Sequence, residues 1–298
     1  MDIEKNHLKE MANGMLNDSI SSRAYEWLFK RYESLFKDKI IMDVGCRSGL
    51  LSLMSVQTGA VKVIAVGNAE SAYFVKKAIS NTEKEDIFEF VKGDIRQIRL
   101  PCGLKKVDII VSEWIGHSIF VDSLFKEVIY ARDKWLVKGG LIVPNVAQLL
   151  LYGVSDHPRE KIEDYPKEDY VPMENIVTEK FLLTKIDLLT ANINDENFKT
   201  PFKVRGLVDS RLGAVVLYSD IGFSLPQGNG RRIYSTSPKK PRSYLKQTIL
   251  FVDNPVVVAR KELVEGVLGM YYRPNLHRKV EYSLSFENCG SEELEETK

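Results

Sequence analysis

The sequence predicts an α/β protein in which a doubly wound parallel sheet is followed by an antiparallel β-barrel domain. Two observations predict this order. Over the first half, short apolar and β-branched runs alternate with longer helical patterns, as in a parallel sheet covered on both faces. After Pro144, short strands separated by turn residues replace that alternation, which is typical of an antiparallel sandwich or barrel. One continuous α/β domain is the alternative.

In the first half, the elements follow from periodicity and from apolar runs. Apolar residues at steps of three and four predict an amphipathic helix over residues 15–36. Buried strands are expected at residues 40–44, 62–66, 88–91, 107–111 and 141–144. Helices are expected from residue 48 onward and over residues 69–81 and 123–136. A helical segment (1–36) therefore precedes the parallel-sheet domain (37–145).

The second half, residues 146–298, carries the pattern of the antiparallel domain. Strands are expected at residues 148–154, 214–223, 244–251, 265–272 and 279–286. Proline, glycine and asparagine near residues 226–230 and at 274–275 supply the turns between them.

Composition excludes several classes of protein. The 298 residues carry 42 Lys and Arg against 41 Asp and Glu, so the net charge of +1 gives no general attraction to nucleic acid or membranes. Cys46, Cys102 and Cys289 lie far apart without a CxxC motif, which argues against a disulfide framework or a metal site. Neither a secretory signal nor a membrane-spanning run is visible. We expect a soluble cytoplasmic protein, with a nuclear location left open.

The turn after the first predicted strand reads G-x-R-x-G, with Asp43 before it, Gly45 and Gly49 at its ends and Arg47 in the middle. Such turns bind nucleotides because their N–H groups face the ligand. This turn belongs to one of four distinctive runs: DVGCRSGLLSL at 43–53, VDIIVSEWIGHSIFVDSLF at 107–125, YARDKWLVKGGLIVPNVAQLLLYGV at 130–154 and STSP at 235–238. In these runs the sequence resembles the protein arginine N-methyltransferase family. The resemblance covers almost the whole chain.

This resemblance implies a Rossmann-type domain that binds S-adenosylmethionine, followed by a β-barrel. Within the family, the chain looks like a type I member and is similar to the inactive regulatory paralogues of kinetoplastids, called prozymes. It also implies where the cofactor contacts fall. Asp43, Gly45 and Gly49 match the cofactor loop.

Four contacts that the resemblance implies are altered in this sequence. Ser21 replaces the arginine that holds the cofactor carboxylate, and Arg47 replaces the middle glycine of the loop. The side chain of Arg47 is expected to point into the cofactor's volume. Gly67 replaces the acidic acceptor of the ribose hydroxyls, and Arg96 replaces the acceptor of the adenine amino group. At roughly 1.5–3 kcal/mol per lost charge-assisted hydrogen bond, the chain is predicted to bind no cofactor.

The paired acidic residues that would hold the acceptor arginine fall on Glu113 and Asp122. A guanidinium presents its donors in a rigid fork, so the shorter Asp122 would spoil a clamp built for two glutamates. We therefore predict that both positions are non-functional, with Glu113 kept as a hydrogen-bonding carboxylate where the domains meet. Trp114 and Phe120 are expected to pack at the same junction.

The segment at residues 155–185 matches the dimerisation arm of the family but is short. We expect a catalytically inactive regulatory subunit that receives the arm of an active paralogue on residues 22–32 and 69–81, with S-adenosylmethionine bound by that partner. The first alternative is a divergent but active methyltransferase.

A second alternative is an RNA-binding module. Basic residues cluster between positions 231 and 246, with Tyr234 and Tyr244 interleaved and no acidic residue among them. The cations are Arg231, Arg232, Lys239, Lys240, Arg242 and Lys246. Such a segment can contact phosphates and stack on bases. A solvated basic loop is the simpler interpretation, and it is the one we favour.

Overall fold

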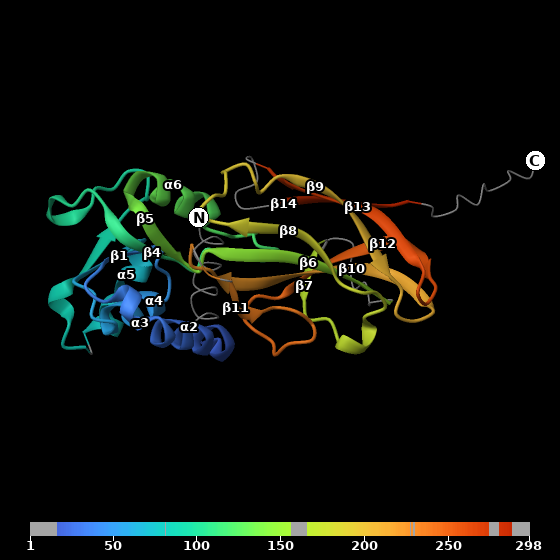
Figure 1. Ribbon diagram of the computed structural model, residues 1–298, viewed down its shortest axis with the longest axis horizontal. Coiled ribbons are helices and arrows are strands. Elements are labelled where there is room, and N and C mark those ends of the chain that lie inside the picture. Colours follow the sequence, from blue (N-terminus) through green and yellow to red (C-terminus); the bar gives the residue numbers. More distant parts are fainter. Residues whose placement is uncertain are drawn as a thin grey trace, which may run out of the picture.

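The computed structural model describes residues 17–80, 82–155, 166–226, 228, 230–273 and 280–287. Figure 1 shows a parallel sheet with its helices at one end of an elongated molecule and long antiparallel strands at the other. This confirms the predicted fold class, a Rossmann-like domain followed by an antiparallel sheet domain. No helix in the described ranges is long and apolar enough to cross a membrane.

The parallel sheet has the strand order β3-β2-β1-β4-β5. Its strands are β1 (Ile40–Val44), β2 (Lys62–Gly67), β3 (Phe88–Lys92), β4 (Val107–Val111) and β5 (Leu136–Val143). The helices between them are α4 (Leu50–Gln57), α5 (Ala69–Ile79) and α6 (Phe125–Trp135), with short 3-10 turns η1 (Glu85–Ile87) and η2 (Pro101–Gly103). Because all pairings are parallel, the carboxyl ends of the strands meet at one edge of the sheet.

Among the described residues before the sheet, two helices replace the single one predicted over residues 15–36. α2 (Ser19–Arg31) ends at Tyr32, whose ψ of 24° breaks the pattern, and α3 (Glu33–Phe36) follows. Asp18 caps α2 by accepting from the N–H of Ile20 at 2.9 Å. Its second carboxylate oxygen accepts from the N–H of Tyr244 at 3.0 Å, which ties the start of the helix to the β domain.

The β domain contains two antiparallel sheets. The larger sheet consists, in order, of β7 (Lys167–Asp169), β12 (Gln247–Val258), β10 (Ser210–Phe223), β6 (Val146–Val154) and β8 (Phe181–Asp187). The strand β11 (Arg231–Ser235) also pairs with β10. The smaller sheet consists of β14 (Val280–Phe286), β13 (Leu263–Tyr272) and β9 (Phe198–Arg205). A 3-10 turn, η4 (Met173–Asn175), precedes β8. The sequence did not predict β7, β8, β9 and β11. The predicted strand at 244–251 corresponds to β12, which begins at Gln247 and continues to Val258.

One apolar core runs through both domains without interruption. Trp114 is fully buried at the junction, where its indole N–H donates to the Pro144 carbonyl at 2.9 Å. Phe120 packs edge-on against Phe125 of α6, with ring centroids 5.1 Å apart. Both aromatic residues therefore pack at the junction, as the sequence predicts. The loop after β4 is consequently held between the two domains.

Candidate functional site

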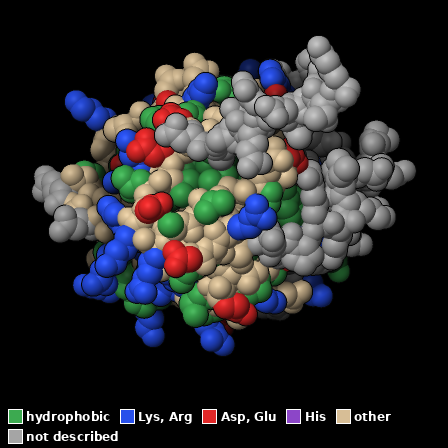
Figure 2. Space-filling model, turned by 90° about the vertical axis from the view of Figure 1, so that its right-hand side faces the viewer, with side chains coloured by type: hydrophobic (Ala, Val, Ile, Leu, Met, Phe, Trp, Pro, Cys, Tyr) green, Lys and Arg blue, Asp and Glu red, His purple; other side chains and the backbone are tan. Residues whose placement is uncertain are grey.

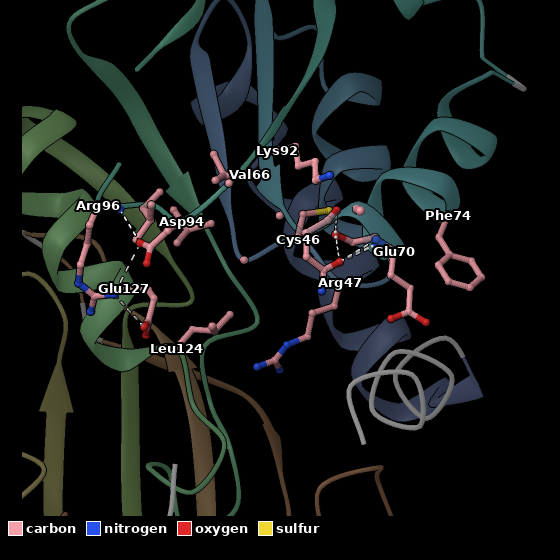
Figure 3. Close-up of a pocket in the computed structure, with 18 residues that line it drawn as sticks. Cys46, Arg47, Val66, Glu70, Phe74, Lys92, Asp94, Arg96, Leu124 and Glu127 are labelled. Atoms are coloured by element: carbon pink, nitrogen blue, oxygen red, sulfur yellow. Dashed lines mark hydrogen bonds and ion pairs between the residues drawn. The ribbon is translucent and has the colours of Figure 1, made fainter. Parts of the chain in front are cut away.

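A cleft of about 530 Å³ lies at the carboxyl edge of the parallel sheet (Figure 3). It is lined by the ends of β1 to β3 and by the first turns of α5 and α6. Its charged lining residues are Arg47, Lys92 and Arg96 together with Glu70, Asp94 and Glu127. This is where doubly wound folds bind ligands, and the volume suits a small molecule.

The loop after β1 keeps the backbone of a ligand-binding turn. Gly45 lines the cleft with a φ of 68°, and Gly49 precedes α4 with a φ of 82°. A Cβ on Gly49 would lie 3.1 Å from the Val75 Cα, so this glycine lets α4 and α5 pack closely. Asp43 is buried below the loop, where Ser52 donates to it at 2.6 Å and burial raises its pKa to about 6. Asp43 and Gly49 shape the loop without lining the cleft.

Gly67 ends β2 in a place that has no room for a side chain. A Cβ built there would lie 2.5 Å from the Ser71 Oγ and 2.7 Å from the Cys46 carbonyl oxygen. Ser71 is in turn held by the N-cap of α5, because its N–H donates to the Asn68 Oδ1 at 2.9 Å. The packing has therefore closed around glycine, and an acidic side chain would require the backbone to move.

Arg96 places a cation at the opposite wall of the cleft. Its guanidinium lies 3.5 Å from Glu127 and 3.7 Å from Asp94, and Figure 3 shows the three side chains together. The same guanidinium lies over the ring of Tyr130, 5.9 Å from its centroid. These contacts hold a cation at the position where the resemblance predicts the acceptor of an adenine amino group.

Arg47 lines the cleft, and its side chain reaches towards the loop after β4. Figure 3 shows its side chain extending away from Lys92. Its Nη2 donates to the main-chain carbonyl of Asp122 at 3.2 Å, so the guanidinium has moved towards the loop after β4. Asp122 has a φ of 56°, a left-handed conformation that aspartate adopts more readily than most residues. A ligand in the cleft would therefore share its wall with the Arg47 side chain.

Glu113 and Ser21 lie in a separate small pocket between α2 and the β domain. Its volume of about 10 Å³ holds at most one water molecule. Burial raises the pKa of Glu113 to about 7, although the nearby positive charge of Arg47 opposes this effect. Ser21 is buried here, away from the cleft that it was predicted to border. The pocket has no room for an acceptor guanidinium.

Two tyrosines that the sequence did not place beside Glu113 close this pocket. Tyr25 of α2 and Tyr234 of β11 meet edge-on with centroids 6.1 Å apart, and both line the pocket beside Glu113. Burial raises the pKa of both phenols, and the charge of Glu113 adds to the effect. Helical periodicity could have identified Tyr25 as a buried residue of α2, because it lies three residues before the buried Leu28. The contact with Tyr234 could not be predicted in this way, because β11 lies far away in the sequence.

The basic segment at 231–246 is largely engaged with the protein itself. Arg232 pairs with Asp220 at 3.2 Å, and Arg231 lies over the ring of Trp27. Lys239 and Arg242 lie over Tyr152 and Tyr170, 5.1 and 4.9 Å from the ring centroids. Tyr234 and Tyr244 both line the small pocket beside Glu113, so neither is placed as a platform for bases.

Taken together, the cleft has room for a nucleoside cofactor, but its residues do not fit S-adenosylmethionine. No acidic side chain can extend from Gly67, Arg96 presents a cation, and Ser21 lies elsewhere. In the described ranges, no group of three His, Cys, Asp or Glu side chains could hold a metal ion.

Two protein families match adjoining parts of the chain. The arginine methyltransferase oligomerization subdomain matches residues 149–291, and the ribosomal protein L11 methyltransferase (PrmA) family matches residues 25–145. Among curated proteins, protein arginine N-methyltransferase 1.1 of Arabidopsis thaliana is 31% identical, covering 92% of this chain and 76% of its own length. Protein arginine N-methyltransferase 1 of Dictyostelium discoideum is 30% identical over 93% and 86% of the two chains.

Solved structures show the same similarity. A chain from the "Trypanosoma brucei PRMT1 enzyme-prozyme heterotetrameric complex with AdoHcy" superposes with a TM-score of 0.85 and 25% identity, covering 93% of both chains. Protein arginine methyltransferase 10 of Arabidopsis thaliana superposes with a TM-score of 0.84, covering 92% and 91% of the two chains. At 23% identity, the second similarity concerns the fold alone.

Proposed function

This chain belongs to the protein arginine N-methyltransferase family, and we propose that it is a catalytically inactive regulatory subunit that assembles with an active type I paralogue and activates it. The observation that carries the proposal is the packing around Gly67, where Ser71 and the Cys46 carbonyl occupy the space of the missing acidic side chain. A cleft that had merely lost a contact would keep that space open. Here the structure around the cofactor position is adapted to glycine.

The acceptor side supports the same proposal. Glu113 lies in a closed pocket against Tyr25 and Tyr234, and Arg47 directs its own guanidinium towards the loop that carries Asp122. An incoming arginine would have to displace two aromatic side chains and compete with an internal cation. In this proposal neither the methyl donor nor the acceptor is bound, and S-adenosylmethionine is bound by the partner.

A partner of the same family is supported by the Trypanosoma brucei neighbour, which is an enzyme–prozyme complex. The arm-docking face that we propose on this chain is the outer surface of α2 and α5. It exposes Tyr73 by 65% and Trp27 by 41%, with Ala72 half-buried beside Tyr73. Val75, which was expected on this face, is instead fully buried against Gly49. Docking there would favour the active conformation of the partner, as a population shift linked to binding.

The direct test of inactivity is a calorimetric titration of the isolated chain with S-adenosylmethionine and S-adenosylhomocysteine. We expect no binding below millimolar concentration, because the ribose and adenine contacts are both absent. Arg47→Gly should not restore binding, since it changes neither Gly67 nor Arg96. Micromolar binding by the unmodified chain would contradict the proposal.

The test of docking uses variants of the exposed aromatic residue and its neighbour. Tyr73→Glu and Ala72→Arg should abolish both assembly with the active paralogue and the gain in its methylation rate. Val61→Glu is the matched control, because Val61 is 51% exposed on the same domain but lies outside α2 and α5. If the Tyr73 and Ala72 variants assemble normally with the active paralogue, the arm-docking face is wrongly placed. Loss of assembly in the Val61→Glu control would also contradict it, because Val61 lies outside that face.

One observation favours the alternative of a divergent, active methyltransferase. The cleft remains open at about 530 Å³ although Arg47 is among the residues that line it. In that case a ligand would be held by a different set of contacts, with Glu70, Lys92 and Asn68 among the lining groups. The same titration decides between the two functions, because only the alternative requires cofactor binding by this chain.

A further inference from the structure

We propose that the end of the β domain farthest from the parallel sheet is a surface on which a second copy of this chain docks. The inference goes beyond the regulatory role and does not depend on it. Four large apolar side chains are exposed there, which we call the end patch: Leu207 (38%), Val208 (47%), Val257 (71%) and Leu263 (52%). Leu207 and Val208 lie in the turn after β9, Val257 lies near the end of β12, and Leu263 begins β13.

Hydrogen bonds between two turns bring the turn that carries Leu207 and Val208 beside the start of β13, where Leu263 lies. The N–H of Gly206 donates to the Glu262 carbonyl, and the N–H of Lys261 donates to the Gly206 carbonyl, both at 2.9 Å. Leu263 is paired with Arg205 across β9 and β13, and Val257 is paired with Arg211 across β10 and β12. Figure 2, which views this end directly, shows apolar side chains gathered near the middle of the face.

Single exposed apolar residues are ordinary, but a group of them on one face is not. Removing apolar surface from water is favourable, so covering the group with a partner would stabilise the complex. Val257 is 71% exposed, whereas the next residue, Val258, is buried in the core. The end patch therefore has the composition of an interface.

The charges around the end patch select the occupant. Its exposed rim carries both signs, and these residues are Arg205, Arg211, Arg260 and Lys261 together with Glu179, Asp209 and Glu262. Nucleic acid would meet the three carboxylates, and a basic peptide would meet the four cations. A second copy related by a two-fold axis can place the cations of one chain opposite the carboxylates of the other. A mixed rim around an apolar centre fits this self-complementary arrangement.

The position of the end patch makes the contact compatible with the other proposed interface. Figure 1 places α5 at the opposite end of the molecule from the labels of β12 and β13, and α2 near the junction of the two domains. A second copy on the end patch would therefore leave the arm-docking face accessible. Two regulatory chains could then each hold an active paralogue at their outer ends.

The test is sedimentation velocity of the isolated full-length chain over a wide concentration range. We expect a reversible dimer for the unmodified chain. The double variant Val257→Asp/Leu263→Asp should raise its dissociation constant about a hundredfold or more, since two apolar contacts are replaced by buried charges. Val61→Asp is the matched control and should dimerise normally, because Val61 is 51% exposed but lies on the other domain. Circular dichroism checks that both variants fold.

The proposal is overturned if the unmodified chain stays monomeric at every concentration, or if the double variant dimerises as tightly as the control. A monomeric chain whose double variant no longer assembles with the active paralogue would assign the end patch to that paralogue instead. A dimer that Val61→Asp disrupts and the double variant does not would place the contact elsewhere. None of these outcomes depends on whether the chain binds a cofactor.

Discussion

Single residues around the cleft differ in how far they have adapted to their new identities. Gly67 is enclosed by Ser71 and the Cys46 carbonyl, and Arg96 is held by two carboxylates. Glu113 is closed in by tyrosines, whereas Arg47 reaches a main-chain carbonyl outside the cleft. Each change is therefore supported by its own neighbours, and reverting one residue leaves the other contacts in place.

Reverting Gly67 to Glu is expected to destabilise the chain without creating a cofactor site. The added Cβ would meet the Ser71 Oγ at 2.5 Å and a backbone oxygen at 2.7 Å, and overpacking of this kind costs roughly 1–3 kcal/mol. Thermal denaturation and calorimetry with S-adenosylmethionine measure the two effects. Gly228→Ala is the control, because its nearest neighbour lies at an ordinary 3.6 Å. A stable Gly67→Glu variant that binds the cofactor would show that the cleft is not closed around glycine.

Glu113 should make the stability of the chain fall as pH rises. Burial raises its folded-state pKa to about 7, so between its usual range near 4.5 and pH 7 the folded state holds a proton that the unfolded chain has lost. The resulting loss is roughly 2 kcal/mol by pH 8, and Glu113→Gln should remove it. Chemical denaturation at pH 5 and pH 8 measures the difference. Asp43, whose pKa is also raised by burial, makes stability fall with pH in the same direction. It is present in both the unmodified chain and the Glu113→Gln variant, so the difference between them reports Glu113.

The contradicting result is a Glu113→Gln variant whose stability changes with pH exactly as that of the unmodified chain does. In that case Glu113 would already be ionised at low pH, in a more polar pocket than the one described.

At the scale of elements, the start of α5 connects the cleft with the proposed docking face. The Asn68 Oδ1 accepts from the N–H groups of Glu70 and Ser71 at 3.0 and 2.9 Å. Asn68→Ala should therefore lower the free energy of unfolding by about 1 kcal/mol, as measured by urea denaturation. Asn68→Asp keeps the acceptor and should be close to neutral. Equal losses for both variants would show that the cap is not what stabilises α5.

The basic segment is expected to contribute little to RNA binding. Lys239 and Arg242 lie over tyrosine rings of the protein, which limits their access to phosphates. We therefore expect the triple variant Lys239→Ala/Lys240→Ala/Arg242→Ala to leave the salt dependence of binding to single-stranded RNA unchanged. If the variant lowers the slope by about two to three, these residues contact phosphates and the segment is a binding site.

Sequence patterns predicted the elements whose partners lie nearby and missed those that depend on distant pairing. The strands of the parallel sheet are apolar runs between helical patterns, so the positions of β1 to β4 followed directly, whereas β5 begins at Leu136, five residues before the predicted strand. β7 and β11 are short and partly polar, and they exist because β12 and β10 pair with them. In the site, the residue changes could be read from the sequence. The direction of the Arg47 side chain and the closure around Glu113 could not, because both depend on loops far apart in the chain.

For the whole molecule, the account assigns different surfaces to different tasks. The parallel-sheet domain offers the proposed arm-docking face, the junction is closed around Glu113, and the far end of the β domain offers the end patch. The fold is kept intact by a core shared between both domains. In the proposed role the chain acts on a partner through binding alone, and binding would stabilise both chains.

The most direct measurement is arginine methylation by the reconstituted complex of this chain with an active paralogue, recorded together with the mass of the assembly. The account predicts that the unmodified chain raises the partner's activity and that Glu113→Gln in this chain leaves the rate of the complex nearly unchanged. If Glu113→Gln abolishes methylation while assembly persists, this chain performs the chemistry and the regulatory account is contradicted.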